Sequence, residues 1–192
     1  MITIRRERPT DVVAREALLD LSFGQCRFDK TSERLREGRR PADGLSFVAV
    51  EGGRQGGRIV GTVRLWHIST GAGRPALLLG PLAVSPDRRN RGIGASLIRR
   101  ALRDARRFGH GAMMLVGDAP YYGRFGFAAD NTGRLWLPGP YEPDRLLALE
   151  LTPGALDGVH GLVAATGEPA RNPQPDALVA RFPRSNGMPR AA

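Results

Sequence analysis

The residues best suited to chemistry form a short glycine-rich loop in the middle of the chain. The loop reads Arg88-Arg89-Asn90-Arg91-Gly92-Ile93-Gly94 and stands between an apolar run ending at Val84 and an amphipathic segment. The first N–H groups of a helix have no partner within the helix and carry the positive end of its dipole. Gly92 and Gly94 would let a phosphate approach these groups closely, and the arginines add positive charge. The loop therefore predicts a site for a diphosphate.

Three other kinds of loop contain glycines at a similar spacing. A Walker loop requires Gly-Lys-Ser/Thr, and this loop contains no lysine. A Rossmann fingerprint requires a third glycine or alanine where Leu97 stands, and it usually opens its domain, whereas this loop lies in mid-chain. A tight strand-to-helix turn also needs glycine without binding a ligand, and glycine spacing alone leaves that alternative open.

A second set of candidate residues, Tyr121-Tyr122-Gly123-Arg124-Phe125-Gly126-Phe127, follows the next apolar run. This element and the glycine loop resemble two signatures of the GCN5-related N-acetyltransferase (GNAT) superfamily, in its bacterial form. Arg89-x-x-Gly92-x-Gly94 is similar to the acyl-CoA signature Gln/Arg-x-x-Gly-x-Gly/Ala, and the aromatic run is similar to the element after the family's fifth strand. Pro81-Leu82-Ala83-Val84 resembles the end of its fourth strand.

The resemblance covers roughly Ile2 to Leu151 and is sharpest from Leu77 to Phe127. It implies an α/β (α+β) fold of the GNAT type, in which helices flank a mixed, mostly antiparallel sheet that splays between strands four and five. It also implies an acyl-CoA-dependent N-acyltransferase. Such an enzyme passes an acetyl group from acetyl-CoA to a primary amine by direct attack in a ternary complex, without a metal. The sequence identifies neither the amine, on a small molecule or a protein, nor the length of the acyl group.

The same resemblance assigns roles to individual residues. The backbone N–H of Leu82 is expected to polarise the acetyl carbonyl, and Tyr122 is expected to act as general acid toward the coenzyme A thiolate. Reference pKa values are about 10 for tyrosine and about 8.5 for a thiol, so full proton transfer is uphill without a shift. The expected contacts to acetyl-CoA are Leu82, Ala83, Val84, Arg88, Arg89, Asn90, Arg91, Gly92, Ile93, Gly94 and Ala95.

The sequence does not identify a general base. Asp118, just beyond the fifth strand, is one candidate, and Glu51, His67 and Asp43 are others. Each is also explained as a turn or surface residue, and water could accept the proton instead. The three histidines show no metal-ligand spacing, and the single cysteine, Cys26, cannot build a zinc site.

Two segments are expected to set acceptor specificity. The first, Cys26 to Arg40, is rich in basic residues, which indicates either an acidic acceptor or a solvated helix, with the solvated helix favoured. The second, Thr132 to Asp144, is apolar enough to wall a small-molecule pocket, through Trp136, Pro140 and Tyr141.

Apolar patterns predict the elements that hold these residues. One helix is expected from about residue 9 to Phe23, with Val12, Val13, Ala17, Leu18 and Leu21 at helical spacing. A second is expected from about Gly92 to Phe108. Short helices are expected near residues 32–36 and 120–125. The predicted strands are Ile2 to Arg5, Leu45 to Glu51, Ile59 to Trp66, Ala76 to Val84, Ala112 to Val116, one starting at Phe127, and Leu146 to Leu151.

The chain of 192 residues, of which 41% are hydrophobic, has the composition of an ordinary soluble globular protein. We expect a GNAT domain over residues 1–151 and a partly irregular extension over 152–192, with an irregular tail from Glu168. No run is long enough for a membrane helix and no signal peptide is evident, which favours the cytoplasm; a homodimer is compatible with the sequence. The net charge of +10 leaves a basic nucleic-acid-binding module as an alternative, though an unfavoured one, and an acyl-CoA sensor without catalysis is another.

Overall fold

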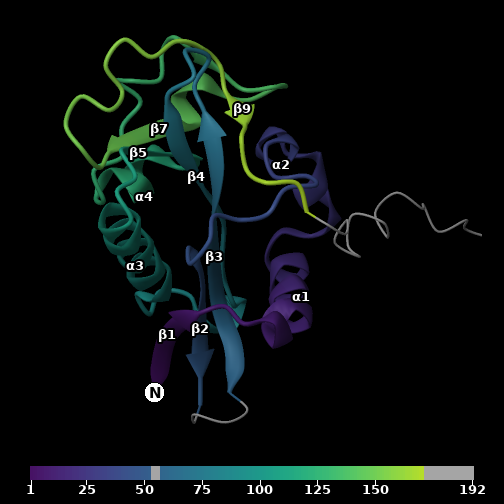
Figure 1. Ribbon diagram of the computed structural model, residues 1–192. Coiled ribbons are helices and arrows are strands. Elements are labelled where there is room, and N and C mark those ends of the chain that lie inside the picture. Colours follow the sequence, from purple (N-terminus) through teal and green to yellow (C-terminus); the bar gives the residue numbers. More distant parts are fainter. Residues whose placement is uncertain (53–56, 171–192) are drawn as a thin grey trace, which may run out of the picture.

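The computed structural model describes residues 1–52 and 57–170, and its main element is one mixed sheet (Figure 1). Six strands follow the order β1-β2-β3-β4-β5-β7, and β9 pairs with the C-terminal end of β3. A separate two-stranded sheet joins β6 (Leu135–Trp136) to β8 (Gly161–Leu162). The main-sheet strands are β1 (Ile2–Arg6), β2 (Ser46–Glu51), β3 (Arg58–Ser69), β4 (Pro75–Val84), β5 (Ala112–Val116), β7 (Leu146–Glu150) and β9 (Ala164–Ala165).

The helices lie on both faces of this sheet. Figure 1 shows α3 on one face and α1 and α2 on the other. Short 3-10 turns lead into or out of several elements. The helices are α1 (Val12–Phe23), α2 (Thr31–Arg34), α3 (Ile93–Arg107) and α4 (Ala119–Gly123), and the 3-10 turns are η1 (Pro9–Asp11), η2 (Gln25–Asp29), η3 (Pro86–Arg88) and η4 (Pro143–Arg145).

The sheet opens between β4 and β5. These strands are parallel and pair only at Leu77 with Met113 and Leu78 with Met114, while every other pair in the main sheet is antiparallel. Beyond Leu78 the two strands separate, so the second half of β4 has no sheet neighbour on that side. The predicted mixed, mostly antiparallel sheet with a splay between its fourth and fifth strands is therefore confirmed.

Helix α3 is held against the sheet by the predicted apolar stripe. The stripe is buried from Ile93 to Ala105, and Arg99, Arg103, Arg106 and Arg107 face solvent. The helix approaches β3 closely because Gly61 has no side chain: a Cβ there would lie 3.0 Å from atoms of Ile93 and Leu97. This contact fixes the first turn of α3, which follows the glycine loop.

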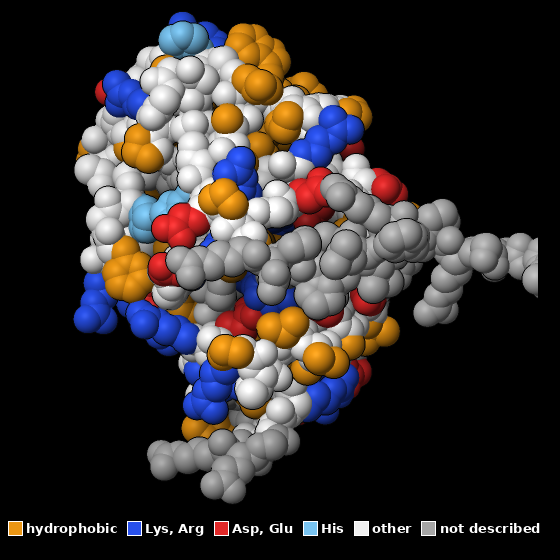
Figure 2. Space-filling model, turned by 45° about the vertical axis from the view of Figure 1, so that its right-hand side comes forward, with side chains coloured by type: hydrophobic (Ala, Val, Ile, Leu, Met, Phe, Trp, Pro, Cys, Tyr) orange, Lys and Arg blue, Asp and Glu red, His pale blue; other side chains and the backbone are white. Residues whose placement is uncertain are grey.

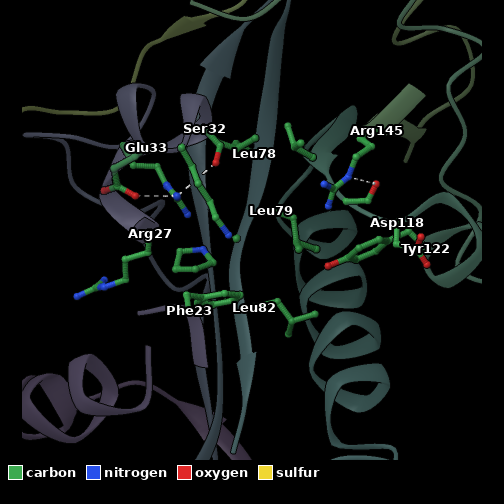
Figure 3. Close-up of a pocket in the computed structure, with 16 residues that line it drawn as sticks. Phe23, Arg27, Ser32, Glu33, Leu78, Leu79, Leu82, Asp118, Tyr122 and Arg145 are labelled. Atoms are coloured by element: carbon green, nitrogen blue, oxygen red, sulfur yellow. Dashed lines mark hydrogen bonds and ion pairs between the residues drawn. The ribbon is translucent and has the colours of Figure 1, made fainter. Parts of the chain in front are cut away.

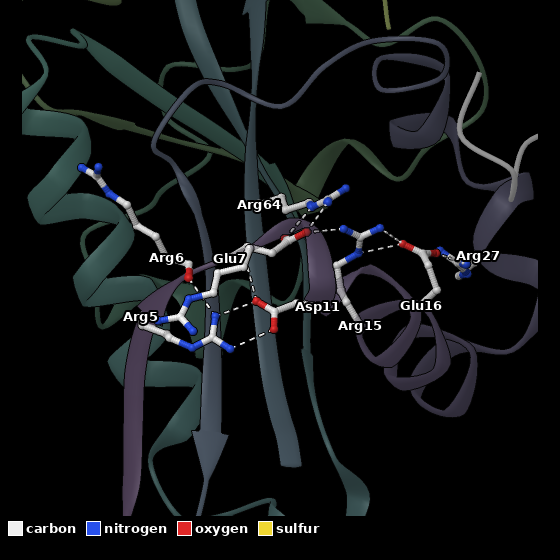
Figure 4. A network of polar contacts seen from close by, with 9 residues as sticks. Arg5, Arg6, Glu7, Asp11, Arg15, Glu16, Arg27 and Arg64 are labelled. Atoms are coloured by element: carbon white, nitrogen blue, oxygen red, sulfur yellow. Dashed lines mark hydrogen bonds and ion pairs between the residues drawn. The ribbon is translucent and has the colours of Figure 1, made fainter. Parts of the chain in front are cut away.

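Helix α1 forms where it was predicted, but its buried face differs from the expected apolar set. Val13 and Leu21 are 81% and 62% exposed, whereas Arg15 is fully buried. Arg15 is retained because Glu7, at the end of β1, accepts hydrogen bonds from it and from Arg64 of β3 (Figure 4). A buried charge of this kind is tolerated only when it is paired.

The same ionic network reaches the start of the next segment. Arg15 also donates to Glu16, and Glu16 accepts from Arg27, with an N–O distance of 2.6 Å for the Arg27 pair (Figure 4). A line of alternating charges therefore connects the sheet to the turn η2.

Residues beyond the last predicted strand take part in the fold. Leu156, Val159 and Val163 are buried in the cluster that covers β5 and β7, and β9 occupies an edge of β3 that β2 leaves free. The strand predicted from Phe127 is wrong: only an isolated pairing of Ala128 with Ala148 occurs there, because the chain turns directly afterwards, where the Thr132 N–H donates to the Ala129 carbonyl. Most of the predicted tail, residues 171–192, lies outside the described residues. No helix in the described ranges is long and apolar enough to cross a membrane.

Candidate active site

A cavity of about 230 Å³ lies where β4 and β5 separate (Figure 3). Leu79 and Leu82 of β4 form its base, Tyr122 and Arg145 project into it from the β5 side, and Glu33 of α2 lies on the opposite wall (Figure 3). Side chains from α2 on one side, and from α4 and η4 on the other, therefore line the opening between β4 and β5. The lining residues are Phe23, Arg27, Lys30, Ser32, Glu33, Arg36, Leu78, Leu79, Gly80, Pro81, Leu82, Val116, Gly117, Asp118, Tyr122 and Arg145.

The β4 wall of the cavity carries a β-bulge. Leu79 is paired with Leu65 and Leu82 with Val63, so β4 holds one extra residue around the cis Gly80-Pro81 peptide. The Gly80 carbonyl accepts a hydrogen bond of 2.7 Å from the indole N–H of Trp66. A bulge re-aims the backbone next to it, and here it lies directly before Leu82, which lines the cavity.

The wall on the β5 side of the cavity presents Tyr122, the predicted general acid. Burial, together with the neighbouring Tyr121, raises the pKa of Tyr122 to about 12, so its hydroxyl keeps its proton at neutral pH. Its ring packs edge-on against Tyr121 at a centroid distance of 4.9 Å. On its other side the ring lies over Gly117, where a Cβ would be 2.3 Å from Cε2 of Tyr122. The ring is therefore held between two neighbours.

The glycine loop lies at the first turn of α3. Gly92 is the N-cap in a left-handed conformation, with φ 74°, and no side chain caps the helix. Arg89, Arg91 and Asn90 are exposed, and neither arginine has a hydrogen bond or ion pair within residues 1–52 and 57–170. The hydroxyl of Tyr121 lies beside this turn, since a Cβ on Gly94 would be 2.8 Å from it.

Arg88 differs from the two other arginines of the loop. Its guanidinium is bound by Glu51 at 2.8 Å and by Asp87 at 2.9 Å. Asp87 also accepts from Arg58 and from Ser85, which together lower the pKa of its carboxyl. Arg88 thus holds the loop against β2, and Arg89 and Arg91 carry its free positive charge.

The remaining predicted contacts offer mainly backbone groups. Ile93 and Ala95 have buried side chains that face the core, and Ala83 packs toward α1. Leu82 and Val84 are half-buried on the open side of β4.

Of the four candidate bases, Asp118 alone lines the cavity. Its carboxylate also caps α4 by accepting from the Tyr121 N–H at 3.3 Å. Glu51 is paired with Arg88, whose hydrogen bond lowers the pKa of Glu51, and Asp43 is an exposed partner of Arg40. His67 lies beside His110, with ring centroids 5.5 Å apart, outside the cavity lining.

The first predicted acceptor segment lines the cavity and the second does not. Residues of η2 and α2, together with Lys30 between them and Arg36 just after α2, supply one wall. Arg36 is buried, so the favoured view of a solvated helix is wrong for this residue. Trp136 is 55% exposed, and Tyr141 turns its hydroxyl to the Leu135 carbonyl at 2.9 Å.

Three residues that line the cavity were not predicted from the sequence. Phe23 ends α1, Arg145 lies just past the second predicted segment, and Gly117 follows β5. A glycine immediately after a buried strand was a usable signal for Gly117. The described residues include no cluster of three or more side chains able to hold a metal ion.

Comparison with known proteins identifies relatives of the chain. The acetyltransferase (GNAT) family model matches residues 14–127. The N-acetyltransferase YhbS of Escherichia coli K12 is 31% identical over 163 residues, which span 83% of this chain and 93% of YhbS. The crystal structure of YhbS from Escherichia coli in complex with CoA matches with a TM-score of 0.72 at 30% identity, covering 86% of this chain and 89% of that one. A GNAT family acetyltransferase from Brucella melitensis in complex with acetyl-CoA matches with a TM-score of 0.60 at 26% identity, covering 86% and 96% of the two chains.

Proposed function

The chain belongs to the GNAT acetyltransferase family, and we propose that it transfers an acetyl group from acetyl-CoA to a primary amine bound in the cavity between β4 and β5. The observation that carries the proposal is the position of this cavity. It lies at the opening of the sheet, next to the bulged end of β4, with Tyr122 on its opposite wall. YhbS and the Brucella melitensis acetyltransferase bind CoA and acetyl-CoA, respectively, on the same fold.

The first turn of α3 fits the pyrophosphate of coenzyme A. Its N–H groups have no side-chain cap, Gly92 leaves them accessible, and Arg89 and Arg91 are free to pair with phosphate oxygens. A helix N-terminus with added arginines is a favourable phosphate site. From there the pantetheine arm would follow the open side of β4 through Val84 to Leu82.

At the cavity, residues of this chain bind, orient and exchange protons. When bound, acetyl-CoA supplies a thioester, whose carbonyl carbon is attacked by the amine nitrogen; a C–N bond forms and the C–S bond breaks. The backbone N–H of Leu82 would stabilise the negative charge on the carbonyl oxygen. Tyr122, protonated at neutral pH, would donate a hydrogen bond and its proton to the leaving sulfur. The amine proton would pass to water or to Asp118.

The raised pKa of Tyr122 shapes this role. A phenol with a pKa of about 12 is a weak acid toward a thiolate, so full transfer is more uphill than for an ordinary tyrosine. The contribution of Tyr122 is therefore mainly a hydrogen bond that strengthens as charge develops on the sulfur. A proton that does pass to the sulfur would be replaced from solvent before the next turnover.

The proposal is tested by acetyl-CoA binding with a matched pair of double variants. Arg89→Gln/Arg91→Gln and Arg106→Gln/Arg107→Gln remove the same charge from opposite ends of α3, and none of the four side chains has an ion-pair partner in the described ranges. We expect the first pair to weaken acetyl-CoA binding by about 10- to 100-fold in calorimetry, because exposed charge-assisted bonds are lost. The second pair should bind like wild type.

A folded wild-type protein that does not bind acetyl-CoA would refute the proposal. Equal weakening by both double variants would refute the assigned phosphate site. Amine-dependent release of free thiol then separates an enzyme from a sensor that only binds acyl-CoA.

The alternative of a basic nucleic-acid-binding module gains no support from the part of the surface shown in Figure 2. On the face shown in Figure 2, Lys and Arg side chains are interspersed with Asp and Glu side chains. Many arginines are also paired, as in Arg5 with Asp11 and Arg58 with Asp87. Part of the high arginine content therefore serves ion pairing within the protein.

A further inference from the structure

The charged side chains that line the cavity are unbalanced. Arg27, Lys30, Arg36 and Arg145 are cations, while Glu33 and Asp118 are the carboxylates of the lining. Arg27 is neutralised outside the cavity by Glu16 and Asp20, and its guanidinium points away from the centre in Figure 3. Three cations and two carboxylates remain, and Asp118 is engaged as the cap of α4.

Arg36 is the most deeply placed of these cations. Its side chain is 7% exposed, and one nitrogen, Nη2, contacts Glu33 at 2.7 Å and Ser32 at 3.4 Å. Its Nε is buried without a hydrogen-bond partner. Its Nη1 faces the bulge of β4, since a Cβ on Gly80 would lie 3.8 Å from it. A buried guanidinium with unused donors costs free energy unless a ligand supplies the acceptor.

Lys30 extends the positive side of the cavity. Its ammonium lies 4.6 Å from the ring centroid of Phe23, and no carboxylate in the described part of the chain pairs with it. Burial, followed by the charges of Arg36 and Arg145, lowers the pKa of Lys30, so these three cations act on one another across the cavity. Arg145 has a loose, exposed carboxylate partner, Glu142, at 3.6 Å, and its Nε donates to the Gly117 carbonyl at 3.5 Å. Like charges that face a common space favour an anion between them.

We propose that the acceptor is a small primary amine that also carries a carboxylate or phosphate group, bound by Arg36 and Lys30 while its amine points toward Leu82 and Tyr122. The inference rests on the proposed acetyl transfer and names its substrate class. The cavity volume of about 230 Å³ matches the size of a small metabolite. Leu78, Leu79 and Phe23 offer an apolar surface to the carbon chain between the two groups.

The first test measures anion binding without requiring a known acceptor. Inorganic phosphate and glutarate are titrated into CoA-saturated protein, in which the phosphate site of α3 is already filled. We expect both Arg36→Met and Lys30→Met to weaken binding about tenfold or more, because a charge-assisted bond is lost. Arg34→Met is the matched control: Arg34 donates to the Pro138 carbonyl at 2.7 Å and does not line the cavity.

Two outcomes of this test would overturn the proposal. One is that the wild-type protein binds neither phosphate nor glutarate. The other is that Arg34→Met weakens anion binding as much as Arg36→Met and Lys30→Met do. Because Lys30 is exposed, Lys30→Met keeps the test valid even where Arg36→Met does not fold.

The second test compares matched amines by thiol release. One pair is 4-aminobutanoate and 4-aminobutanamide, and the other is phosphoethanolamine and ethanolamine. We expect the anionic member of at least one pair to have the higher kcat/KM, with a KM that rises about tenfold or more in Lys30→Met. The two pairs also distinguish a carboxylate from a phosphate. Preference for the neutral amines, with acetyl-CoA binding intact, would overturn the acceptor class alone, whereas loss of acetyl-CoA binding would overturn the proposed function itself.

Discussion

Gly117 offers a test of the position of Tyr122 that leaves its hydroxyl in place. An alanine methyl at residue 117 would lie 2.3 Å from Cε2 of Tyr122, whereas an ordinary contact is at least 3.4 Å. The ring must therefore retreat by about 1 Å, and Tyr121 and Phe127 limit the directions open to it. Gly117 does not have a positive φ, so the backbone itself accepts alanine.

A displacement of this size should reduce turnover strongly. A misplacement of about 1 Å in a reacting group can cost on the order of 10²-fold in rate, which corresponds to roughly 2.7 kcal/mol of activation free energy. We expect Gly117→Ala to lower kcat by about this factor while acetyl-CoA affinity stays near wild type. The control is Gly123→Ala in α4, where a Cβ would have no atom within 4 Å. Overpacking can also cost about 1–3 kcal/mol of stability, so unfolding midpoints are measured alongside the kinetics.

A double-mutant cycle separates positioning from general damage. If Gly117→Ala acts through the Tyr122 hydroxyl, it should have little further effect on kcat in a Tyr122→Phe background. A folded Gly117→Ala variant with wild-type kcat would refute the reasoning. Fully additive losses in the double variant would show that the glycine acts on something other than this hydroxyl.

Three further predictions concern ionisable groups. Because the pKa of Tyr122 is raised to about 12, its phenol stays protonated, so the ratio of wild-type kcat to that of Tyr122→Phe should stay constant from about pH 6 to about pH 10; a ratio that falls within this range would contradict the assigned pKa. The pKa of Lys30 is lowered from its ordinary value of 10.5, and its charge is lost as pH rises through the lowered pKa. For an anionic acceptor, the ratio of wild-type kcat/KM to that of Lys30→Met should therefore fall toward one as pH rises, with the midpoint of the fall below pH 10.5. A ratio independent of pH would count against Lys30. Glu7→Gln removes the carboxylate between the buried Arg15 and Arg64 and should lower the free energy of unfolding in urea by about 3–5 kcal/mol, against little change for Asp43→Asn at an exposed pair.

Local patterns were enough to predict most of the fold. The apolar run of β4, the stripe of α3 and the glycine between them depend on neighbours in sequence, so their positions were readable. The buried face of α1 was not, because Arg15 is buried with two partners, Glu7 just after β1 and Glu16 on α1, that no periodicity reveals. The strand expected from Phe127 is absent because the chain turns after Ala128, where both the N–H and the hydroxyl of Thr132 donate to the Ala129 carbonyl.

The site was predictable where it depends on one segment, and less so where segments meet. The loop Arg89 to Gly94 and Tyr122 could be named from motifs, whereas the separate role of Arg88 depends on Glu51, which is distant in sequence. The segment that contains α2 was expected to contribute to acceptor binding, but the side chains that line the cavity were not identified. Whether a basic residue such as Arg36 is solvated or buried is decided by tertiary packing.

The lowered pKa of Lys30 has a consequence for the chemistry of the acceptor. Lys30 is itself a primary amine at this cavity, and burial and the nearby guanidinium groups make its protonated form less favourable. An incoming ammonium group is subject to the same desolvation and the same repulsion, and it therefore gives up its proton more readily than it does in water. For an amine bound beside these groups, the cavity would favour the uncharged, nucleophilic form, and a solvent molecule could then serve as the proton acceptor.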